Sequence, residues 1–230
     1  MKRYTAIVLA GGAGKRMGST VHKQYLQLAG KPVIYYALRA FEESRVTDIV
    51  LVTGEGETEY CRREIIEPYG LQRIRAVVEG GRERYHSVQK GLLAAHGADY
   101  VLIHDGVRPF VTTDIIHRSM ECVRQHGACI AGIPVKDTIK RVGAEGFVEE
   151  TPERSVLWQI QTPQTFSFSL ISEAYGRMSG QEERMVTDDA MVVEQTMGIR
   201  VKVIEGSYRN IKLTTPEDLT VAEAFLAQEG

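Results

Sequence analysis

The sequence is short of cysteine and of net charge, and each shortage excludes a class of protein. Its three cysteines, Cys61, Cys122 and Cys129, show no C-x-x-C spacing. They provide neither a disulfide framework nor a zinc site, so we expect buried free thiols in a reducing compartment. Lysine and arginine number 28 and aspartate and glutamate 30, a net charge of -2 that argues against a general nucleic-acid coat.

The sequence also lacks a long apolar run at its start, internal repeats and low-complexity stretches. Residues 1–4 lead directly into a short strand pattern. This start predicts neither a signal peptide nor a membrane span, and a cytoplasmic enzyme or binding protein is the expected class. Since 43% of the residues are hydrophobic and no stretch has linker composition, residues 1–230 are expected to form a single domain with one substantial core.

Short apolar segments alternate with helix-like segments, which predicts an α/β fold with a Rossmann-like, doubly wound, mostly parallel sheet. The predicted strands are Thr5–Leu9, Asp48–Thr53, Ile74–Val78, Tyr100–His104, Ala128–Val135 and Val201–Ile204. The predicted helices are Pro32–Phe41, Glu57–Tyr69, Arg84–Ala95, Asp114–His126, Ser169–Met178 and Asp188–Met197. A last helix is expected to begin with Thr215 as its cap, Pro216 at its first position and Asp218 at its third.

A glycine-rich loop with two cations follows the first predicted strand. Residues 10–18 read Ala-Gly-Gly-Ala-Gly-Lys-Arg-Met-Gly, and Lys23 comes shortly after. Glycines let backbone N–H groups approach an anion closely, and Arg16 and Lys23 add charge that can neutralise a triphosphate. The loop is not a Walker loop, because Leu9 stands where the first glycine belongs, and Met17 replaces the third glycine of the dinucleotide fingerprint. A phosphate loop of another kind is predicted, with a purely structural turn as the alternative.

Two more polar segments follow predicted strands. Residues 80–82 read Gly-Gly-Arg after the third strand, and residues 105–109 read Asp-Gly-Val-Arg-Pro after the fourth. In open α/β sheets the ligand crevice lies outside the carboxyl ends of the strands. These segments are therefore expected to converge on the glycine-rich loop.

The α/β alternation breaks after Val135. Residues 136–158 contain a strand-like stretch at 137–142, a turn at 143–146 and the apolar pair Phe147-Val148. This pattern predicts a projecting β-arm. Because a hairpin of this kind does not bury both faces alone, 136–158 is predicted to be a dimerisation arm, and a surface hairpin folded on its own domain is the alternative.

Seven motifs, in order along the chain, are together more specific than any one of them. They are LAGGAGKRM at 9–17, KQY at 23–25, GGR at 80–82, HDGVRPF at 104–110, PVKDTIK at 134–140, QTPQ at 161–164 and NIKLTTPED at 210–218. From about Thr5 to Leu226 the chain resembles the 2-C-methyl-D-erythritol 4-phosphate cytidylyltransferase family. The resemblance implies transfer of CMP from CTP to the methylerythritol phosphate, with release of pyrophosphate, in the non-mevalonate isoprenoid pathway. It also implies a need for Mg²⁺ and a homodimer formed through the arm.

The same resemblance implies roles for four basic residues. It assigns Arg16 and Lys23 to stabilising the transition state at the α-phosphate, and Arg154 and Lys212 to positioning the methylerythritol phosphate. When a substrate phosphate attacks the α-phosphorus in line, negative charge spreads over the phosphate oxygens, and fixed cations and a metal stabilise it. The reaction needs no protein nucleophile, and a largely ionised phosphate monoester has no evident need of a general base.

The remaining site residues are also carried over from the family. The implied nucleotide-binding residues are Ala10, Gly11, Gly12, Ala13, Gly14, Gly81, Arg82, Ser87, Asp105 and Gly106. The implied substrate-binding residues are Asp105, Arg108, Thr138, Arg154, Thr187 and Lys212. Thr138 and Arg154 are expected to reach the site from the partner's arm, and Asp105 is the implied Mg²⁺ ligand. His22 and His104 border the site and are given no role.

Other interpretations stay open. Ribitol 5-phosphate cytidylyltransferase shares the glycine-rich loop and the Asp-x-Val-Arg-Pro segment, although 134–140, 157–160 and 187–190 look more like the methylerythritol enzyme. A regulatory module that keeps the nucleotide cradle without catalysis is an alternative from a different class. Taken singly, Lys23 is compatible with a solvated surface cation, and Asp105 with a residue that caps its turn.

Overall fold

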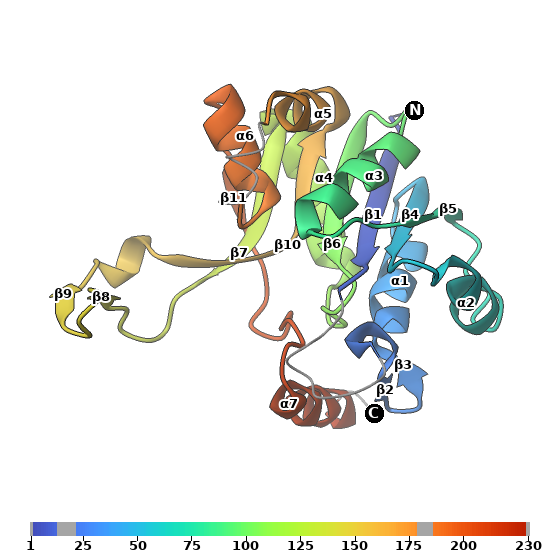
Figure 1. The fold of residues 1–230 in the computed structure, drawn as a ribbon, viewed down its shortest axis with the longest axis horizontal. Helices are drawn as coiled ribbons and strands as arrows, with labels where there is room; N and C mark the ends of the chain where they lie inside the picture. The colour runs from blue at the N-terminus through green and yellow to red at the C-terminus, as the bar shows by residue number, and fades with distance from the viewer. Residues whose placement is uncertain (1, 13–21, 179–185, 229–230) are drawn as a thin grey trace.

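The computed structural model describes residues 2–12, 22–178 and 186–228. Its centre is a seven-stranded sheet with the order β11-β7-β10-β6-β1-β4-β5 (Figure 1). These strands are β1 Tyr4–Ala10, β4 Asp48–Thr53, β5 Ile74–Glu79, β6 Tyr100–Asp105, β7 Ala128–Pro134, β10 Trp158–Ser167 and β11 Lys202–Glu205. Two small antiparallel pairs lie outside this sheet, β2 Gln27–Leu28 with β3 Lys31–Pro32, and β8 Arg141–Val142 with β9 Val148–Glu150. The predicted mostly parallel α/β sheet is confirmed.

Helices follow most strands. They are α1 Val33–Glu43, α2 Thr58–Cys61, α3 Arg84–Ala94, α4 Thr113–His126, α5 Phe168–Arg177, α6 Asp189–Met197 and α7 Pro216–Ala227. The predicted start of α7 is confirmed, since Thr215 caps it, Pro216 is at its first position and the Thr215 N–H donates to Asp218 Oδ2 at 2.9 Å. Among the described residues, no helix is both long enough and apolar enough to cross a bilayer.

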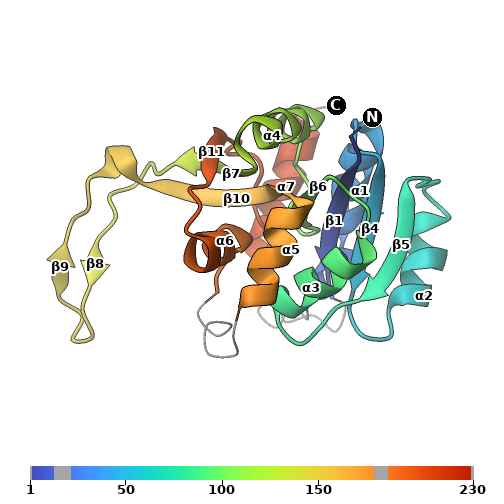
Figure 2. The same ribbon diagram turned by 90° about the horizontal axis from the view of Figure 1, so that it is seen from above.

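The helices cover both faces of the sheet (Figure 2). On one face, Phe41 of α1 and Ile115 of α4 share a core cluster with Val8 of β1. On the other face, helices α3, α5 and α6 pack in a second cluster that includes Ile7 of β1 and Ile171 of α5. Neighbouring residues of β1 thus serve opposite faces, as expected for a strand buried on both sides.

Strand β10 was not predicted. It runs antiparallel between β6 and β7, and its register shifts between Ile160 and Gln164. Its middle reads Gln-Thr-Pro-Gln, so it has no apolar run to signal a strand. Gln161, Thr162 and Gln164 are nevertheless buried, because their polar atoms are hydrogen-bonded to other segments. Local patterns miss a strand whose burial depends on such partners.

Three further predictions need correction. The single helix expected at Glu57–Tyr69 is the short α2 followed by a π-helical turn at Arg62–Ile66. The strand expected at 137–142 is reduced to the two residues of β8. All three cysteines are free, but Cys122 is only partly buried.

The segment 136–158 projects from the body of the molecule as predicted (Figure 1). Its apolar side chains are exposed, with Phe147 at 74% and Val156 at 69%. Dimerisation through the arm stays a prediction.

Gly91 of α3 provides a test of how tightly the helix packs on the sheet. A Cβ added there would lie 2.5 Å from Ile7 Cγ2 and 3.2 Å from Val52 Cγ2. We expect Gly91→Ala to lower the free energy of unfolding by about 1–3 kcal/mol, the usual cost of overpacking. In α5, Gly176→Ala is the matched control, because an added Cβ meets nothing within 4 Å, and we expect a gain of up to about 1 kcal/mol from helix propensity. Urea unfolding measures the free energy of unfolding of the two variants, and a higher value than that of the wild type in both would contradict this packing.

Candidate active site

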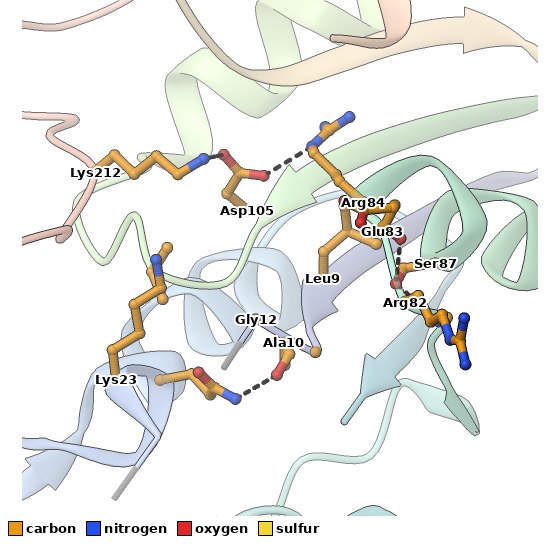
Figure 3. A pocket seen from close by; sticks show the side chains of 14 residues that line it. Leu9, Ala10, Gly12, Lys23, Arg82, Glu83, Arg84, Ser87, Asp105 and Lys212 are labelled. Carbon is orange, nitrogen blue, oxygen red and sulfur yellow. Dashed lines mark hydrogen bonds and ion pairs between the residues drawn. The ribbon is translucent and has the colours of Figure 1, made fainter. Parts of the chain in front are cut away.

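A cavity of about 250 Å³ opens at the carboxyl ends of β1 and β6 (Figure 3). It is lined by Leu9, Ala10, Gly11, Gly12, Lys23, Gln24, Gly81, Arg82, Glu83, Arg84, Ser87, Asp105, Val107 and Lys212. In Figure 3, Lys23 and Lys212 lie on one side of the cavity, and Arg82 and Ser87 on the other. The predicted convergence of the strand-end segments is confirmed.

Most of the nucleotide-binding residues implied by the sequence therefore lie together. Ala10, Gly11, Gly12, Gly81, Arg82, Ser87 and Asp105 line this cavity, as do the basic residues Lys23 and Lys212. Three other predicted residues, Ala13, Gly14 and Arg16, lie outside the described residues. Gly106 lines neither this cavity nor the one beside it.

The glycines bring backbone segments close together at this edge of the sheet. The Gly106 N–H donates to the Leu9 carbonyl at 2.8 Å, and a Cβ on Gly106 would lie 2.9 Å from that oxygen. Gly106 thus ties β6 to β1 behind the cavity. The Gly81 N–H donates to Ser87 Oγ at 3.1 Å, which holds the Gly-Gly-Arg segment on the first turn of α3.

Asp105 is surrounded by cations at the end of β6. Its Oδ2 lies 2.9 Å from Lys212 Nζ and 3.7 Å from Arg108 Nε, and its Oδ1 lies 3.4 Å from Arg84 Nε. Burial acts to raise the pKa of Asp105, but the charges of Arg84, Lys212 and Arg108 outweigh it and hold the pKa well below its usual range. Asp105 is therefore an ionised carboxylate at neutral pH.

A second cavity, also of about 250 Å³, shares Arg84, Asp105 and Lys212 with the first. Arg108 and Thr187, both predicted to bind the substrate, line it. The other lining residues are Ile160, Gln161, Thr162, Gln164 and Asp188. The two cavities thus meet at one carboxylate and two cations, so two anionic ligands bound in them would be neighbours.

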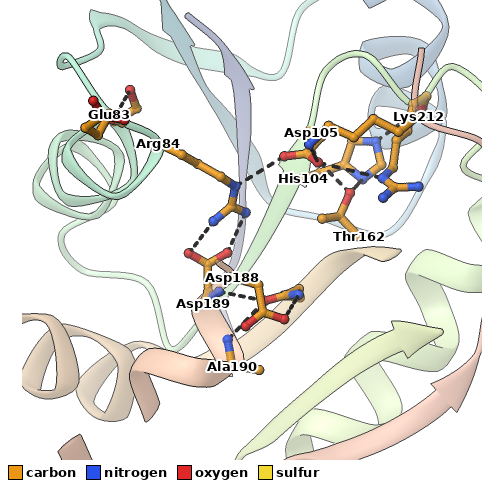
Figure 4. A network of polar contacts seen from close by, with 12 residues as sticks. Glu83, Arg84, His104, Asp105, Thr162, Asp188, Asp189, Ala190 and Lys212 are labelled. Atoms are coloured by element: carbon orange, nitrogen blue, oxygen red, sulfur yellow. Dashed lines mark hydrogen bonds and ion pairs between the residues drawn. The ribbon is translucent and has the colours of Figure 1, made fainter. Parts of the chain in front are cut away.

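Arg84, which is partly exposed, forms an ion pair with the buried Asp189 beside this junction, and the sequence did not reveal this pair (Figure 4). Arg84 donates to both oxygens of Asp189, at 2.9 and 2.7 Å, and the Tyr175 hydroxyl donates to Oδ1 at 2.6 Å. Burial acts to lower the pKa of Arg84, but Asp189 and Asp105 more than offset it, so the pKa is raised. In the sequence, Arg84 stands only as the start of a helix, and no local signal pairs it with a residue so far along the chain.

Gln164 of β10 holds the beginning of α6. Its Oε1 accepts hydrogen bonds from the N–H groups of Asp189 and Ala190, at 2.9 and 3.1 Å, and its Nε2 donates to Asp188 Oδ2 at 3.0 Å. Gln164 therefore fixes Asp189 under Arg84. Gln164 is the last residue of the QTPQ motif at 161–164, but nothing in the sequence indicates that it holds the start of α6.

His104 is a buried, neutral residue behind Asp105. Thr162 Oγ1 accepts from the Asp105 N–H at 3.1 Å and lies 3.0 Å from His104 Nδ1. Because the Arg108 carbonyl can only accept, His104 Nε2 carries the proton and donates to it at 3.3 Å, and Nδ1 accepts from the Thr162 hydroxyl. Burial lowers the pKa of His104 to about 4. The ring links Asp105 to Arg108 and is not exposed to the cavity.

The structure does not bring Thr138 and Arg154 to either cavity of their own chain. Both are exposed on the arm, and Arg154 Nη1 donates to the Lys136 carbonyl at 3.0 Å. Their expected contribution to a partner's site stays a prediction.

Known proteins match this chain over nearly its whole length. The sequence model of IspD, 2-C-methyl-D-erythritol 4-phosphate cytidylyltransferase, matches residues 4–228. The chain belongs to this family. A cytidylyltransferase of that name from Lachnoclostridium phytofermentans is 49% identical over 228 residues, which cover 99% of this chain and 98% of that protein. One from Lachnospira eligens is 51% identical over 224 residues, covering 96% of this chain and 98% of that protein.

A solved structure supports the same placement. The crystal structure of 4-diphosphocytidyl-2C-methyl-D-erythritol synthase from Anaerococcus prevotii superposes with a TM-score of 0.84 at 33% identity, covering 98% of this chain and 96% of that one. The family resemblance read from the motifs is confirmed, and so is the class of enzyme, a nucleotidyltransferase.

The neutral state of His104 predicts a pH dependence of stability. Its pKa of about 4 in the folded chain lies below the ordinary value of 6.5. As pH falls, this histidine therefore takes up a proton in the unfolded chain before it does so in the folded chain. The stability that neutral His104 contributes is fully present above pH 6.5 and is lost progressively between pH 6.5 and pH 4, by about 3 kcal/mol in all. In His104→Gln, which has no such proton, we expect the unfolding free energy from urea titrations to fall less steeply over this range. Parallel curves for the two proteins would contradict a neutral His104.

Proposed function

We propose that the protein transfers CMP from CTP to 2-C-methyl-D-erythritol 4-phosphate and releases pyrophosphate, as the names of its relatives describe for them. The observation that carries the proposal is the junction of the two cavities, where Asp105, Arg84 and Lys212 are shared. One cavity adjoins the glycine-rich loop and suits CTP. The other suits the phosphorylated polyol.

The first cavity supplies the chemistry that a nucleoside triphosphate needs. The segment 10–12 presents backbone with little side chain, and Lys23 lies beside it, with Nζ on a flexible stem that a phosphate can engage. Arg82 and Ser87 lie across the cavity from Lys23, and the Gly81 N–H donates to Ser87 Oγ. These three residues are proposed to contact the cytosine end of CTP. In the proposed complex the triphosphate lies near Asp105 and the base near the start of α3.

The second cavity receives the attacking phosphate. Arg108 and Lys212 provide positive charge and Thr187 a hydroxyl, a set that suits a phosphate monoester bearing hydroxyl groups. Since Lys212 lines both cavities, it lies where the attacking phosphate and the α-phosphate of CTP would meet. Holding the two reactants in this way lowers the entropic part of the barrier.

The proposed reaction proceeds by in-line attack of the substrate phosphate on the α-phosphorus. Lys23, together with Arg16 of the loop, stabilises the negative charge that develops on the phosphate oxygens. Asp105 does not act as a base, because its pKa is held well below the usual range by the cations around it. Positioning and charge account for catalysis, and no protein nucleophile is involved.

The residues present suit Mg²⁺ bound mainly through substrate oxygens. In the described parts of the chain, no three His, Cys, Asp or Glu side chains gather to hold a metal. Asp105 offers one ionised carboxylate at the cavity junction, and Mg²⁺ is commonly held by one or two carboxylates plus substrate phosphates. Asp105 would hold the ion there, and the ion would neutralise charge on the transferring phosphates.

The proposal includes a homodimer in which each arm completes the site of the other subunit. Thr138 and Arg154 are exposed and line neither cavity of their own chain, and the arm that carries them projects from the body of the molecule (Figure 2). Exposed Phe147 and Val148 near its tip provide an apolar surface for a partner. In this arrangement the partner's Arg154 binds the methylerythritol phosphate.

Pyrophosphate release tests the activity directly. Purified protein with Mg²⁺ and CTP is expected to release pyrophosphate when 2-C-methyl-D-erythritol 4-phosphate is added, and to stop when EDTA removes the metal. Ribitol 5-phosphate is assayed in parallel. Release with ribitol 5-phosphate alone would reassign the polyol, and CTP binding without release on either polyol would favour a regulatory module.

Removing a loop cation is expected to lower turnover. We expect Lys23→Ala or Arg16→Ala to reduce kcat by about 10²- to 10³-fold, the usual cost of losing a transition-state donor. Lys202→Ala, an exposed lysine on the edge strand β11, is the matched control and should keep its turnover. Near-wild-type kcat in both loop variants would overturn the proposed mechanism.

A heterodimer tests whether the arm serves the partner's site. Differently tagged Lys23→Ala and Arg154→Ala chains are co-expressed and the mixed dimer is isolated. One of its two sites then has both an intact Lys23 and an intact Arg154 from the partner, so about half of the wild-type activity should return. If each arm serves its own chain, neither site is intact and the mixed dimer stays inactive.

A further inference from the structure

Lys23 belongs to a 3-10 turn, Lys23–Tyr25, that lies beside the first cavity (Figure 3). The turn is closed by the Tyr25 N–H, which donates to the His22 carbonyl at 2.9 Å. Three residues of such a turn have little stability of their own. Its position must therefore come from contacts with other segments.

One contact joins the turn to the end of β1. Gln24 Nε2 donates to the Ala10 carbonyl at 2.5 Å, and Gln24 is 1% exposed. This bond fixes the side of the turn that faces the glycine-rich loop. A Cβ on Gly12 would lie 3.8 Å from Lys23 Cε, so the lysine stem lies beside that loop.

Glu57, in the loop after β4, makes a second contact with the turn. Its Oε2 accepts hydrogen bonds from the Tyr25 hydroxyl and from the Gly54 N–H, both at 2.9 Å. Its Oε1 lies 2.5 Å from His22 Nδ1. One carboxylate thus contacts the residues on both sides of Lys23 and Gln24.

The neighbours of Glu57 are arranged to admit its carboxylate. A Cβ on Gly54 would lie 2.5 Å from Glu57 Oε2, so only glycine leaves this space free. Tyr25 is buried, and its hydroxyl lies 3.1 Å from Cys61 Sγ. Burial, followed by Cys61 and Glu57, raises the pKa of Tyr25, so the hydroxyl keeps the proton that it donates.

We propose that Glu57 is a positioning residue for Lys23, acting through Tyr25 to hold the turn beside residues 10–12. The inference rests on the proposed function, because it requires Lys23 to act on the triphosphate. A lysine has high conformational freedom, so its effect on a transition state depends on how well its backbone is held. Glu57 lies in none of the seven motifs that identify the family.

The test is a double-mutant cycle measured by pyrophosphate release with Mg²⁺, CTP and 2-C-methyl-D-erythritol 4-phosphate. Glu57→Ala removes the acceptor, and Tyr25→Phe removes the donor while keeping the ring. With Lys23 intact, we expect each variant to lower kcat by about 10- to 100-fold, since small displacements of a catalytic group are costly. In the Lys23→Ala background, each should change kcat less than about 2-fold, since coupled residues are not additive.

Glu79→Ala is the matched control. Glu79 Oε1 accepts from the Gly56 N–H at 2.9 Å, so it supports the same loop after β4. This hydrogen bond joins Glu79 to Gly56 and not to the turn that carries Lys23. We expect Glu79→Ala to change kcat less than about 2-fold in either background, because its contact does not reach the lysine.

The outcomes separate this inference from the proposed function. Equal losses with Lys23 present and absent would make Glu57 a general structural residue and overturn the inference alone. Full turnover in Glu57→Ala and Tyr25→Phe, or an equal loss in Glu79→Ala, would also overturn it. Full turnover in Lys23→Ala would overturn the proposed role of Lys23, and this inference with it.

Discussion

The carboxylate of Asp105 lies at the end of β6 among three cations, and both cavities are built around it. With 10% of its side chain exposed, it is close to Lys212, Arg108 and Arg84. Arg84 also forms an ion pair with Asp189, so three cations lie beside two carboxylates, those of Asp105 and Asp189. The surplus of positive charge favours an anion in the cavity lined by residues 10–12, and the fixed cations need little rearrangement to bind phosphate.

Strand β10 links the parts of the molecule that this site requires. It begins at the root of the arm, passes between β6 and β7, and carries Thr162 and Gln164 to the site. Thr162 contacts Asp105 and His104, and Gln164 holds the start of α6. A polar strand in the middle of the sheet is stable here because its side chains are paired with backbone and side-chain groups from other elements. The arm and the cavities therefore share one continuous strand.

Particular residues explain how far the sequence predicted the site. Glycines after a strand, together with Arg16 and Lys23, were sufficient to predict a phosphate site. Because parallel strands end at the same edge of a sheet, the segment that begins with Asp105 was also expected there, whereas Lys212 was assigned only through the family resemblance. Arg84 and Asp189 were missed, because the pair joins α3 to α6 and neither residue has a local signal. Glu57 was missed for the same reason, since its role depends on Tyr25 and Gly54 lying beside it.

Local patterns thus accounted for the alternation of strands and helices, the caps, the glycine-rich loop and the family. These features depend on residues close together in the chain, where periodicity and turn chemistry act directly. The position of β10, the Arg84–Asp189 pair and the neutral His104 depended on the folded chain. Each requires polar groups from distant segments to meet in a buried space, where the cost of desolvation is offset only by partners that folding brings together.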